Sequence, residues 1–287
     1  MGSEFLGAPA LVFTEDLKQI QRMAPLMQKV LIVDPAPASA RMLGDLLRSI
    51  TQLQLWTAPT TRKGLEAARQ INPQLIFVEL AGTDVDGIDF TRALRRSEAA
   101  CRQVPIIMVT ATATAAAIVG ARDAGVHEFL RKPYTTKDLL RRLEAVTLRP
   151  RDWVEAVEYI GPDRRRFNSG DYKGALKRRS DLKATPDAAR ITQALKIVRS
   201  AVPAVVTDPA QAMRAMLAQM VELQRAATVT KNAELAKATA EFQLFLAKAA
   251  QTGVLVPAQV AQQAAPLLAF LPKEEPSREK SAKEKAA

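Results

Sequence analysis

The chain has 287 residues, 48% of them hydrophobic and 25% charged, which allows one large domain or two small ones and predicts at least one soluble globular domain. The formal net charge is +11 at pH 7, but the basic residues are spread along the chain, so the charge does not predict a whole domain that binds nucleic acid. Cys101 is the only cysteine, which excludes a disulfide within the chain and fits a reducing cytosol.

The N-terminal segment is not typical of a secretory signal, because acidic residues flank its short apolar stretch. Residues 13–27 have the spacing of a short amphipathic helix. An uncharged run at residues 104–121 is rich in Ala and Thr and contains Pro105 and Gly120, so it is better explained as a buried strand followed by a helix than as a membrane span. We therefore expect a cytoplasmic protein without a membrane span.

Between residues 28 and 148 the chain alternates between buried strands and amphipathic helices. Apolar runs typical of strands with both faces covered lie at 29–34, 53–58, 74–79, 104–110 and 127–130. Helical spacing follows them at 39–50, 61–71, 88–96, around 118–125 and from 136 onward. These alternations predict an α/β domain with a doubly wound, five-stranded parallel sheet. Its functional crevice is expected at the carboxyl ends of the strands, where Asp34, Glu79, Thr110 and Lys132 lie.

Residues 149–186 contain glycines and prolines that break any long helix, and we expect them to form a basic linker. A near-repeat within this linker twice places a Tyr and a Gly before a run that is rich in basic residues. The repeated positions are Tyr159 with Arg164, Arg165 and Arg166, and Tyr172 with Arg178 and Arg179. One interpretation is a solvated linker. The other is a binding site for an acidic partner or a cyclic dinucleotide, since Arg binds phosphate and Tyr stacks on bases.

From residue 187 the pattern is helical again, which predicts an all-α C-terminal region. Asp208-Pro209 marks the start of a helix whose apolar rhythm breaks near residues 228–230 and then resumes until Gly253. One stripe of this helix consists of Met213, Met216, Met220 and Leu223. It predicts a helix–helix core or a homodimer seam, with a Met-rich binding groove as the alternative. The expected order is an N-terminal extension at 1–27, the α/β domain at 28–148, the basic linker at 149–186, the helical module at 187–271 and a disordered tail at 272–287.

Five short motifs at the ends of the predicted strands match a known family in order and spacing. They are Val33-Asp34, Phe77-Val78-Glu79, Asp86-Gly87, Val109-Thr110-Ala111 and Phe129-Leu130-Arg131-Lys132-Pro133. On these motifs, residues 28–148 resemble the receiver domain of bacterial response regulators of the CheY type. The resemblance implies that an acidic pair and a phospho-accepting aspartate hold Mg²⁺, while a hydroxyl and an ammonium bind the phosphoryl oxygens. It also implies that Thr110 and Lys132 supply these two groups, and that Phe129 is the aromatic residue that switches the neighbouring surface.

The chain departs from that pattern at two positions. Glu79 stands where the family has the phospho-accepting aspartate, and Pro35 stands where it has the second acid of the pair. A longer side chain misplaces the nucleophile, and in-line phosphoryl transfer tolerates little misplacement. We therefore predict a degenerate receiver with no catalytic residue and no cofactor, in which Mg²⁺ binding is in doubt. Glu79 either imitates the phosphorylated state by pairing with Lys132, or only fills space while it pairs with Lys132.

These observations lead to three hypotheses of function. The first is a non-enzymatic adaptor in two-component signalling, which binds other signalling proteins through its phosphorylation-independent receiver surface and its C-terminal helices. The second is an effector that binds cyclic di-GMP through the arginines of the linker. The third is a DNA-binding transcription regulator, against which the sequence argues because no compact recognition module with a tight turn follows the receiver.

Overall fold

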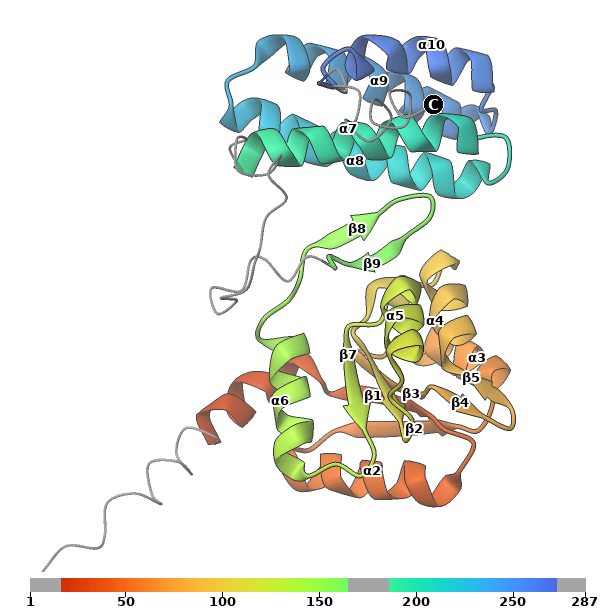
Figure 1. Ribbon diagram of the computed structural model, residues 1–287, viewed down its shortest axis with the longest axis vertical. Helices are drawn as coiled ribbons and strands as arrows, with labels where there is room; N and C mark the ends of the chain where they lie inside the picture. Colours follow the sequence, from red (N-terminus) through yellow and green to blue (C-terminus); the bar gives the residue numbers. More distant parts are fainter. Residues whose placement is uncertain (1–16, 165–185, 273–287) are drawn as a thin grey trace, which may run out of the picture. The chain divides into compact units, whose positions relative to one another are not determined.

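The computed structural model describes residues 17–164 and 186–272 (Figure 1). The described chain divides into two compact units. The first contains residues 17–154 and 159–164, and the second contains residues 155–158 and 186–272. The tail from residue 273 and the repeat positions Arg165, Arg166, Tyr172, Arg178 and Arg179 lie outside the described residues, so the expectations for them stay predictions.

The first unit is built on a parallel sheet (Figure 1). Its strand order is β2-β1-β3-β6-β7. Its strands are β1 (Lys29–Val33), β2 (Gln54–Ala58), β3 (Leu75–Glu79), β6 (Ile106–Thr110) and β7 (Glu128–Arg131). They match the apolar runs of the sequence, and the predicted fold class is confirmed. Because β1 pairs in parallel with both β2 and β3, the strand order reverses at β1. The crevice of such a sheet lies at the carboxyl ends of the strands beside this reversal.

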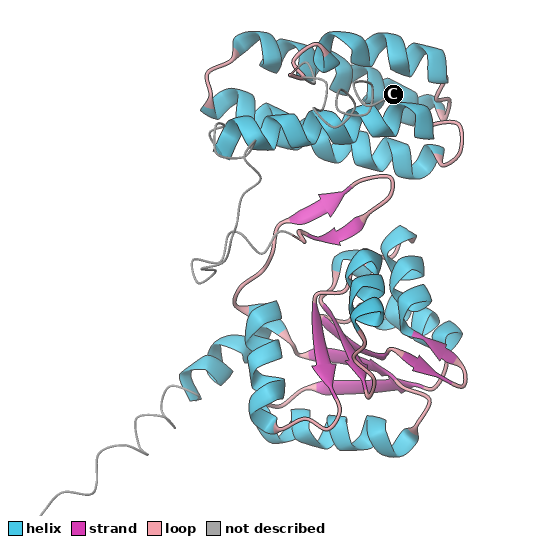
Figure 2. Cartoon of the chain, viewed as in Figure 1, coloured by secondary structure: helices cyan, strands magenta, loops and turns pink. Residues whose placement is uncertain are grey.

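Helices cover both faces of the sheet (Figure 2). One face carries α2 (Pro37–Ile50) and α6 (Thr136–Thr147), and the other carries α3 (Thr61–Ile71), α4 (Gly87–Arg96) and α5 (Ala115–Ala124). Successive residues of a strand point to opposite faces, so Leu31 and Val33 enter the core under α3–α5, while Val30 and Ile32 enter the core under α2 and α6. Burial on both faces explains why the strands are continuous apolar runs.

The N-terminal extension packs on the first unit. Residues 17–23 are helical, and the 3-10 helix η1 (Ala24–Leu26) follows. Met23 and Met27 are 2% and 0% exposed and belong to the core under α2 and α6. The helix that the sequence predicts at 13–27 is therefore present over its described part, and its apolar residues extend the core of the sheet domain.

The segment expected to be a linker begins with a hairpin, in which β8 (Trp153–Glu155) pairs with β9 (Ile160–Pro162). Arg95 of α4 explains part of its position. This side chain is 1% exposed; it donates hydrogen bonds to the backbone oxygens of Gly125 and Arg102, and its guanidinium lies 5.1 Å from the centre of the Trp153 ring. Residues 153–162 of the segment expected to be a linker therefore form a hairpin, because contacts with distant residues fold them.

The second unit is a bundle of four helices. They are α7 (Pro186–Ala204), α8 (Pro209–Val229), α9 (Ala233–Thr252) and α10 (Pro257–Leu268). Each contributes to one apolar core, which includes Leu195, Met220, Leu246 and Leu267, all 0% exposed. The predicted break between α8 and α9 is confirmed: Asn232 caps α9 by accepting a hydrogen bond from Leu235 N at 3.0 Å. Among the described helices, none has the length and apolarity needed to cross a membrane.

Candidate functional site

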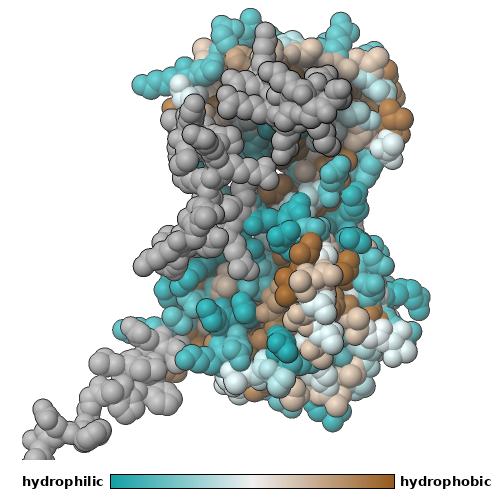
Figure 3. Space-filling model, in the orientation of Figure 1, coloured by the Kyte–Doolittle hydropathy of each residue, from teal (hydrophilic) through white to brown (hydrophobic). Residues whose placement is uncertain are grey.

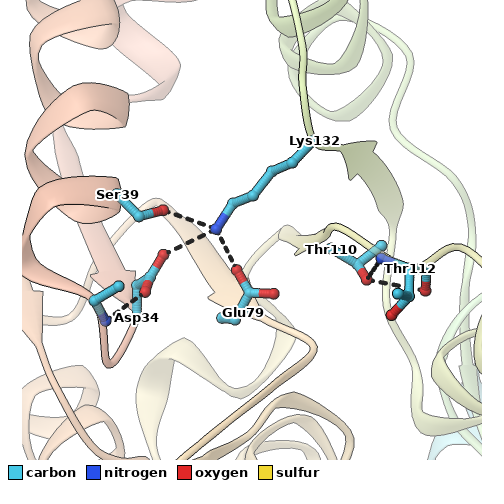
Figure 4. Close-up of polar contacts among 7 residues, drawn as sticks. Asp34, Ser39, Glu79, Thr110, Thr112 and Lys132 are labelled. Carbon is cyan, nitrogen blue, oxygen red and sulfur yellow. Dashed lines mark hydrogen bonds and ion pairs between the residues drawn. The ribbon is translucent and has the colours of Figure 1, made fainter.

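Three charged side chains meet at the carboxyl ends of the strands (Figure 4). Asp34 follows β1, Glu79 ends β3 and Lys132 follows β7. The Lys132 Nζ lies 2.5 Å from Glu79 Oε2 and 3.3 Å from Asp34 Oδ2. Glu79 and Asp34 are only 9% and 8% exposed. One ammonium therefore bridges two carboxylates in a site that is largely removed from water.

Ser39 is a fourth member of this cluster, and sequence reasoning missed it. Its Oγ accepts a hydrogen bond from Lys132 Nζ at 2.7 Å (Figure 4). An ammonium has three hydrogens, and the three oxygen acceptors from Asp34, Ser39 and Glu79 match that number. The available signal was the position of Ser39 in the first turn of α2, because the helix that follows β1 begins beside the crevice.

Pro35 replaces the second acid with an apolar contact. The Asp34 Oδ1 accepts a hydrogen bond from Ala36 N at 2.8 Å, while Oδ2 is the oxygen that faces Lys132. The Pro35 ring packs against β4 (Ala81–Gly82), which forms a short antiparallel hairpin with β5 (Val85–Asp86). A Cβ atom at Gly82 would overlap this ring. Pro35 therefore supplies no metal ligand, and its ring lies directly against the loop that follows Glu79.

Burial and pairing shift the pKa values of both partners of the ion pair. Burial raises the pKa of Glu79 above its usual 4.5, and the hydrogen bond and charge of Lys132 only partly offset this effect. Burial alone would lower the pKa of Lys132, but the Glu79 and Asp34 carboxylates outweigh it and leave that pKa above the usual 10.5. The ammonium is therefore charged at neutral pH, and the site contains a cation of its own.

The site residues Thr110 and Phe129 make other contacts. The Thr110 Oγ1 donates a hydrogen bond to Thr112 O at 3.1 Å and accepts one from Thr112 N at 3.0 Å, so its hydroxyl is turned toward its own loop (Figure 4). Phe129 is partly buried and packs against the core under α3–α5. The structure thus brings Asp34, Glu79 and Lys132 into contact, and the switching role of Phe129 stays a prediction.

The residues present do not fit Mg²⁺. This ion requires near-octahedral oxygen ligands and binds proteins mainly through carboxylates. Within the described residues, no group of three or more His, Cys, Asp or Glu side chains could hold a metal ion. The two carboxylates at the site already share the Lys132 ammonium, and Pro35 supplies no third. Both carboxylates are thus paired with an ammonium in place of a metal ion.

The described part of the first Tyr–Gly–basic copy, residues 159–164, is folded onto the first unit. Tyr159 is 6% exposed, and its hydroxyl donates a hydrogen bond to Pro162 O at 2.6 Å. The Arg164 guanidinium lies over the Tyr159 ring, 3.8 Å from its centre, and forms an ion pair with Asp123. Both side chains therefore have partners within the fold, and a ligand-binding role for the repeat stays a prediction.

Comparison with known proteins finds matches to the part of the chain that contains the site. The sequence model of the response regulator receiver domain matches residues 30–144. The DNA-binding response regulator MtrA of Mycolicibacterium smegmatis is 30% identical over 139 residues, which are 48% of this chain and 59% of MtrA. The KDP operon transcriptional regulatory protein KdpE of Escherichia coli is 34% identical over 123 residues, which are 43% of this chain and 52% of KdpE. The chain thus spans little more than half the length of these relatives.

Solved structures also resemble a part of the chain. The chemotaxis protein CheY4 of Vibrio cholerae is 25% identical, and the match covers 42% of this chain and 98% of that one, with a TM-score of 0.39. A putative response regulator from Chloroflexus aurantiacus is 24% identical, and the match covers 43% of this chain and 99% of that one, with a TM-score of 0.40. These matches cover less than half of the chain.

Proposed function

Since residues 30–144 form a response regulator receiver domain, the class of domain used in two-component signalling, we propose that the chain is a non-enzymatic signalling adaptor whose receiver works without phosphorylation. The observation that carries the proposal is the Lys132 ammonium, which contacts oxygen atoms of Glu79, Ser39 and Asp34 at 2.5, 2.7 and 3.3 Å. In phosphorylated receivers a lysine of this kind binds the phosphoryl group. Here the carboxylate of Glu79 already takes that place.

Two further features support the proposal. Glu79 carries one more methylene than aspartate, so its carboxylate lies further along the path of an incoming phosphoryl group, and transfer in line tolerates little misplacement. Pro35 removes one carboxylate from the usual metal site, so the charge of a phosphoryl donor would not be neutralised by Mg²⁺. The receiver would then present one surface to its protein partners at all times, and the C-terminal helices or a second copy of the chain would provide further contacts.

The proposal predicts that the protein does not take phosphate. Incubation with acetyl phosphate, or with beryllofluoride, in the presence of Mg²⁺ should leave the intact mass and the ¹H–¹⁵N spectrum of the receiver unchanged. Glu79→Asp alone should not restore Mg²⁺ binding, because the ligand missing at Pro35 is still absent. The double variant Pro35→Asp/Glu79→Asp is the matched control and should regain Mg²⁺-dependent spectral changes. A stable phosphoryl adduct on Glu79 of the parent chain would contradict the proposal.

DNA binding is the second candidate, because MtrA is named a DNA-binding response regulator and KdpE a transcriptional regulatory protein. These matches cover little more than half of each relative. They therefore support a shared receiver domain and say nothing about the remainder of each relative. A gel-shift titration with mixed duplex DNA at two salt concentrations tests this candidate, because specific binding survives salt better than binding driven by the net charge of +11.

The cyclic di-GMP hypothesis is tested by titration of the parent chain and of the triple variant Arg164→Ala, Arg165→Ala and Arg166→Ala.

A further inference from the structure

The last helix of the helical unit lies in a segment without charge. Residues 249–272 contain no Lys, Arg, Asp, Glu or His, although 25% of the chain is charged. A run of this kind is expected to be buried, as the apolar strand β6 is. In α10, however, only Val260, Ala264 and Leu267 are buried, and eight of the twelve residues are exposed. The helix therefore presents an uncharged surface to water.

The other three helices of the unit carry charged side chains on their exposed surfaces. These are Lys196 and Arg199 on α7, Glu222 and Arg225 on α8, and Lys237, Glu241 and Lys248 on α9. Gln262 of α10 is two residues from both Val260 and Ala264, which places it on the side of the helix opposite the core. Ala258 and Ala265 lie in the same outer row, because they are four residues before and three residues after Gln262.

Exposed apolar side chains lie at the start of this helix. Val254 and Val256 are 60% and 38% exposed, and Val256 is the N-cap residue of α10. Leu255 between them packs against the helical core, so the loop is held in place while both valines remain in contact with water. Hydrophobic residues are visible at the surface of the helical unit in Figure 3. Covering the two valines would stabilise a complex, because full burial of one valine side chain contributes about 1.5 kcal/mol or more.

The charge of the unit limits the kind of partner that this surface fits. Residues 186–272 contain eight basic and five acidic side chains, so two copies repel each other unless they meet through a surface without charge. An acidic or basic partner would find no ion pair on α10. A lipid surface is generally bound through a broad apolar face with basic residues beside it, and α10 has no basic residue.

The surface of α10 is also complementary to itself. The amide of Gln262 carries hydrogen-bond donors and an acceptor, so it can pair with the same amide in a second copy. A twofold contact uses the same patch on both copies, and a contact centred on the outer row brings the two Gln262 side chains together. Alanines on either side of Gln262 let two helices approach closely, since the distance between packed helices depends on the side chains at the contact.

We propose that the α10 face, defined by Val254, Val256, Ala258, Gln262 and Ala265, binds the same face of a second copy of this chain. The chain would then form a twofold dimer through its helical unit. This inference goes beyond the proposed adaptor role and does not depend on whether the receiver takes phosphate.

Sedimentation velocity of the full chain over a range of concentrations should show a monomer–dimer equilibrium. Gln262→Lys and Gln262→Glu should each raise the dissociation constant of the dimer at least about tenfold, because two like charges meet near the twofold axis. An equimolar mixture of the two variants should recover the dimer, since opposite charges then meet. Gln224→Lys, at an exposed position of α8, is the matched control and should dimerise as the parent does.

A parent chain that stays monomeric at every concentration overturns the proposal, as do Gln262 variants that dimerise as the parent does or whose mixture stays monomeric. Circular dichroism shows whether the variants keep their helices. If a charged variant loses them, Val254→Ser/Val256→Ser takes its place and should also weaken the dimer. Flotation with phosphatidylcholine vesicles that is seen for the parent and lost in Gln262→Lys would assign the face to a lipid surface, which likewise overturns the proposal.

Discussion

Lys132 determines the charge balance of the receiver site. Its ammonium bridges Asp34 and Glu79, whose side chains are 7% and 11% exposed, and the Lys132 side chain is itself 24% exposed. Two carboxylates held this close repel each other unless a cation lies between them. Lys132 therefore stabilises the fold mainly because its removal would leave the two buried carboxylates of Asp34 and Glu79 unpaired.

We expect Lys132→Met to lower the free energy of unfolding by about 2–3 kcal/mol, because charged hydrogen bonds are lost and two carboxylates face each other unpaired. Urea unfolding at pH 7 measures this change. Lys137→Met, at an exposed position of α6, is the matched control and should change stability by no more than about 0.5 kcal/mol. Equal effects of the two substitutions would show that the bridge contributes nothing to stability.

His127 makes the stability of the first unit depend on pH. Its Nδ1 accepts hydrogen bonds from Ile106 N and from Arg95 Nη2, both at 3.3 Å, and its ring stacks on Trp153. Burial, followed by the charges of Arg95 and Arg151, lowers its pKa well below 6.5. Below pH 6.5 the unfolded chain therefore binds a proton at His127 that the folded chain does not bind.

This difference in bound protons determines whether the free energy of unfolding rises or falls with pH. As the pH falls from 6.5 toward the folded pKa, the free energy of unfolding should fall by up to about 1.4 kcal/mol per pH unit. Urea unfolding between pH 7.5 and pH 5.5 measures the slope. The variant His127→Gln cannot titrate, so its slope should be shallower than that of the parent. Coincident slopes would assign the pH dependence to other groups.

At the scale of elements, the β4–β5 hairpin and the Pro35 ring depend on each other. A Cβ at Gly82 would overlap the ring, which has little freedom to move aside. Gly82→Ala should therefore lower stability by about 1–3 kcal/mol, as overpacking generally does. The same substitution in a Pro35→Ala background should have a smaller effect, and a double-mutant cycle by urea unfolding measures the difference. Additive effects would mean that the two residues are not coupled.

The five strands of the sheet and most of the helices could be predicted from the sequence because their signals are local, whereas the short hairpins β4–β5 and β8–β9 could not. The apolar run of β3 and the loss of helical rhythm after α8 are both visible without any tertiary contact. Arg95 could not be predicted in this way. A basic residue in the last turn of an amphipathic helix predicts an exposed side chain, but the Arg95 side chain is buried. Its burial depends on the Gly125 and Arg102 carbonyls, which only the folded chain brings together.

Part of the site could also be predicted, because the ends of the strands are visible in the sequence. Strand ends locate Asp34, Glu79 and Lys132, because parallel strands align their carboxyl ends. The contact of Ser39 with Lys132 joins residues from opposite ends of the domain, and no periodicity of the sequence encodes it. The hydrogen bond between Gln211 and Glu155 is missed for the same reason, since the residues that surround each of them carry no sign of the pairing.

At the scale of the whole molecule, each unit has an apolar core of its own. Leu223 is 0% exposed in the helical core and Leu94 is 0% exposed in the receiver core. We expect Leu223→Ala to weaken the helical unit by about 2–5 kcal/mol and to leave protection of the receiver strands unchanged, with the reverse for Leu94→Ala. Region-resolved hydrogen exchange measures both effects. Loss of protection in both units from either substitution would show that they unfold as one.

The pairing of Glu79 with Lys132 also has a consequence for how the molecule behaves in time. A phosphoryl group on an aspartate is removed by water, so a phosphorylated receiver resets within the lifetime of that bond. The carboxylate of Glu79 is part of the covalent chain and cannot leave. Under the proposed function, the output of this receiver does not decay with a phosphoryl bond, so its strength follows the amount of the protein that the cell makes and degrades.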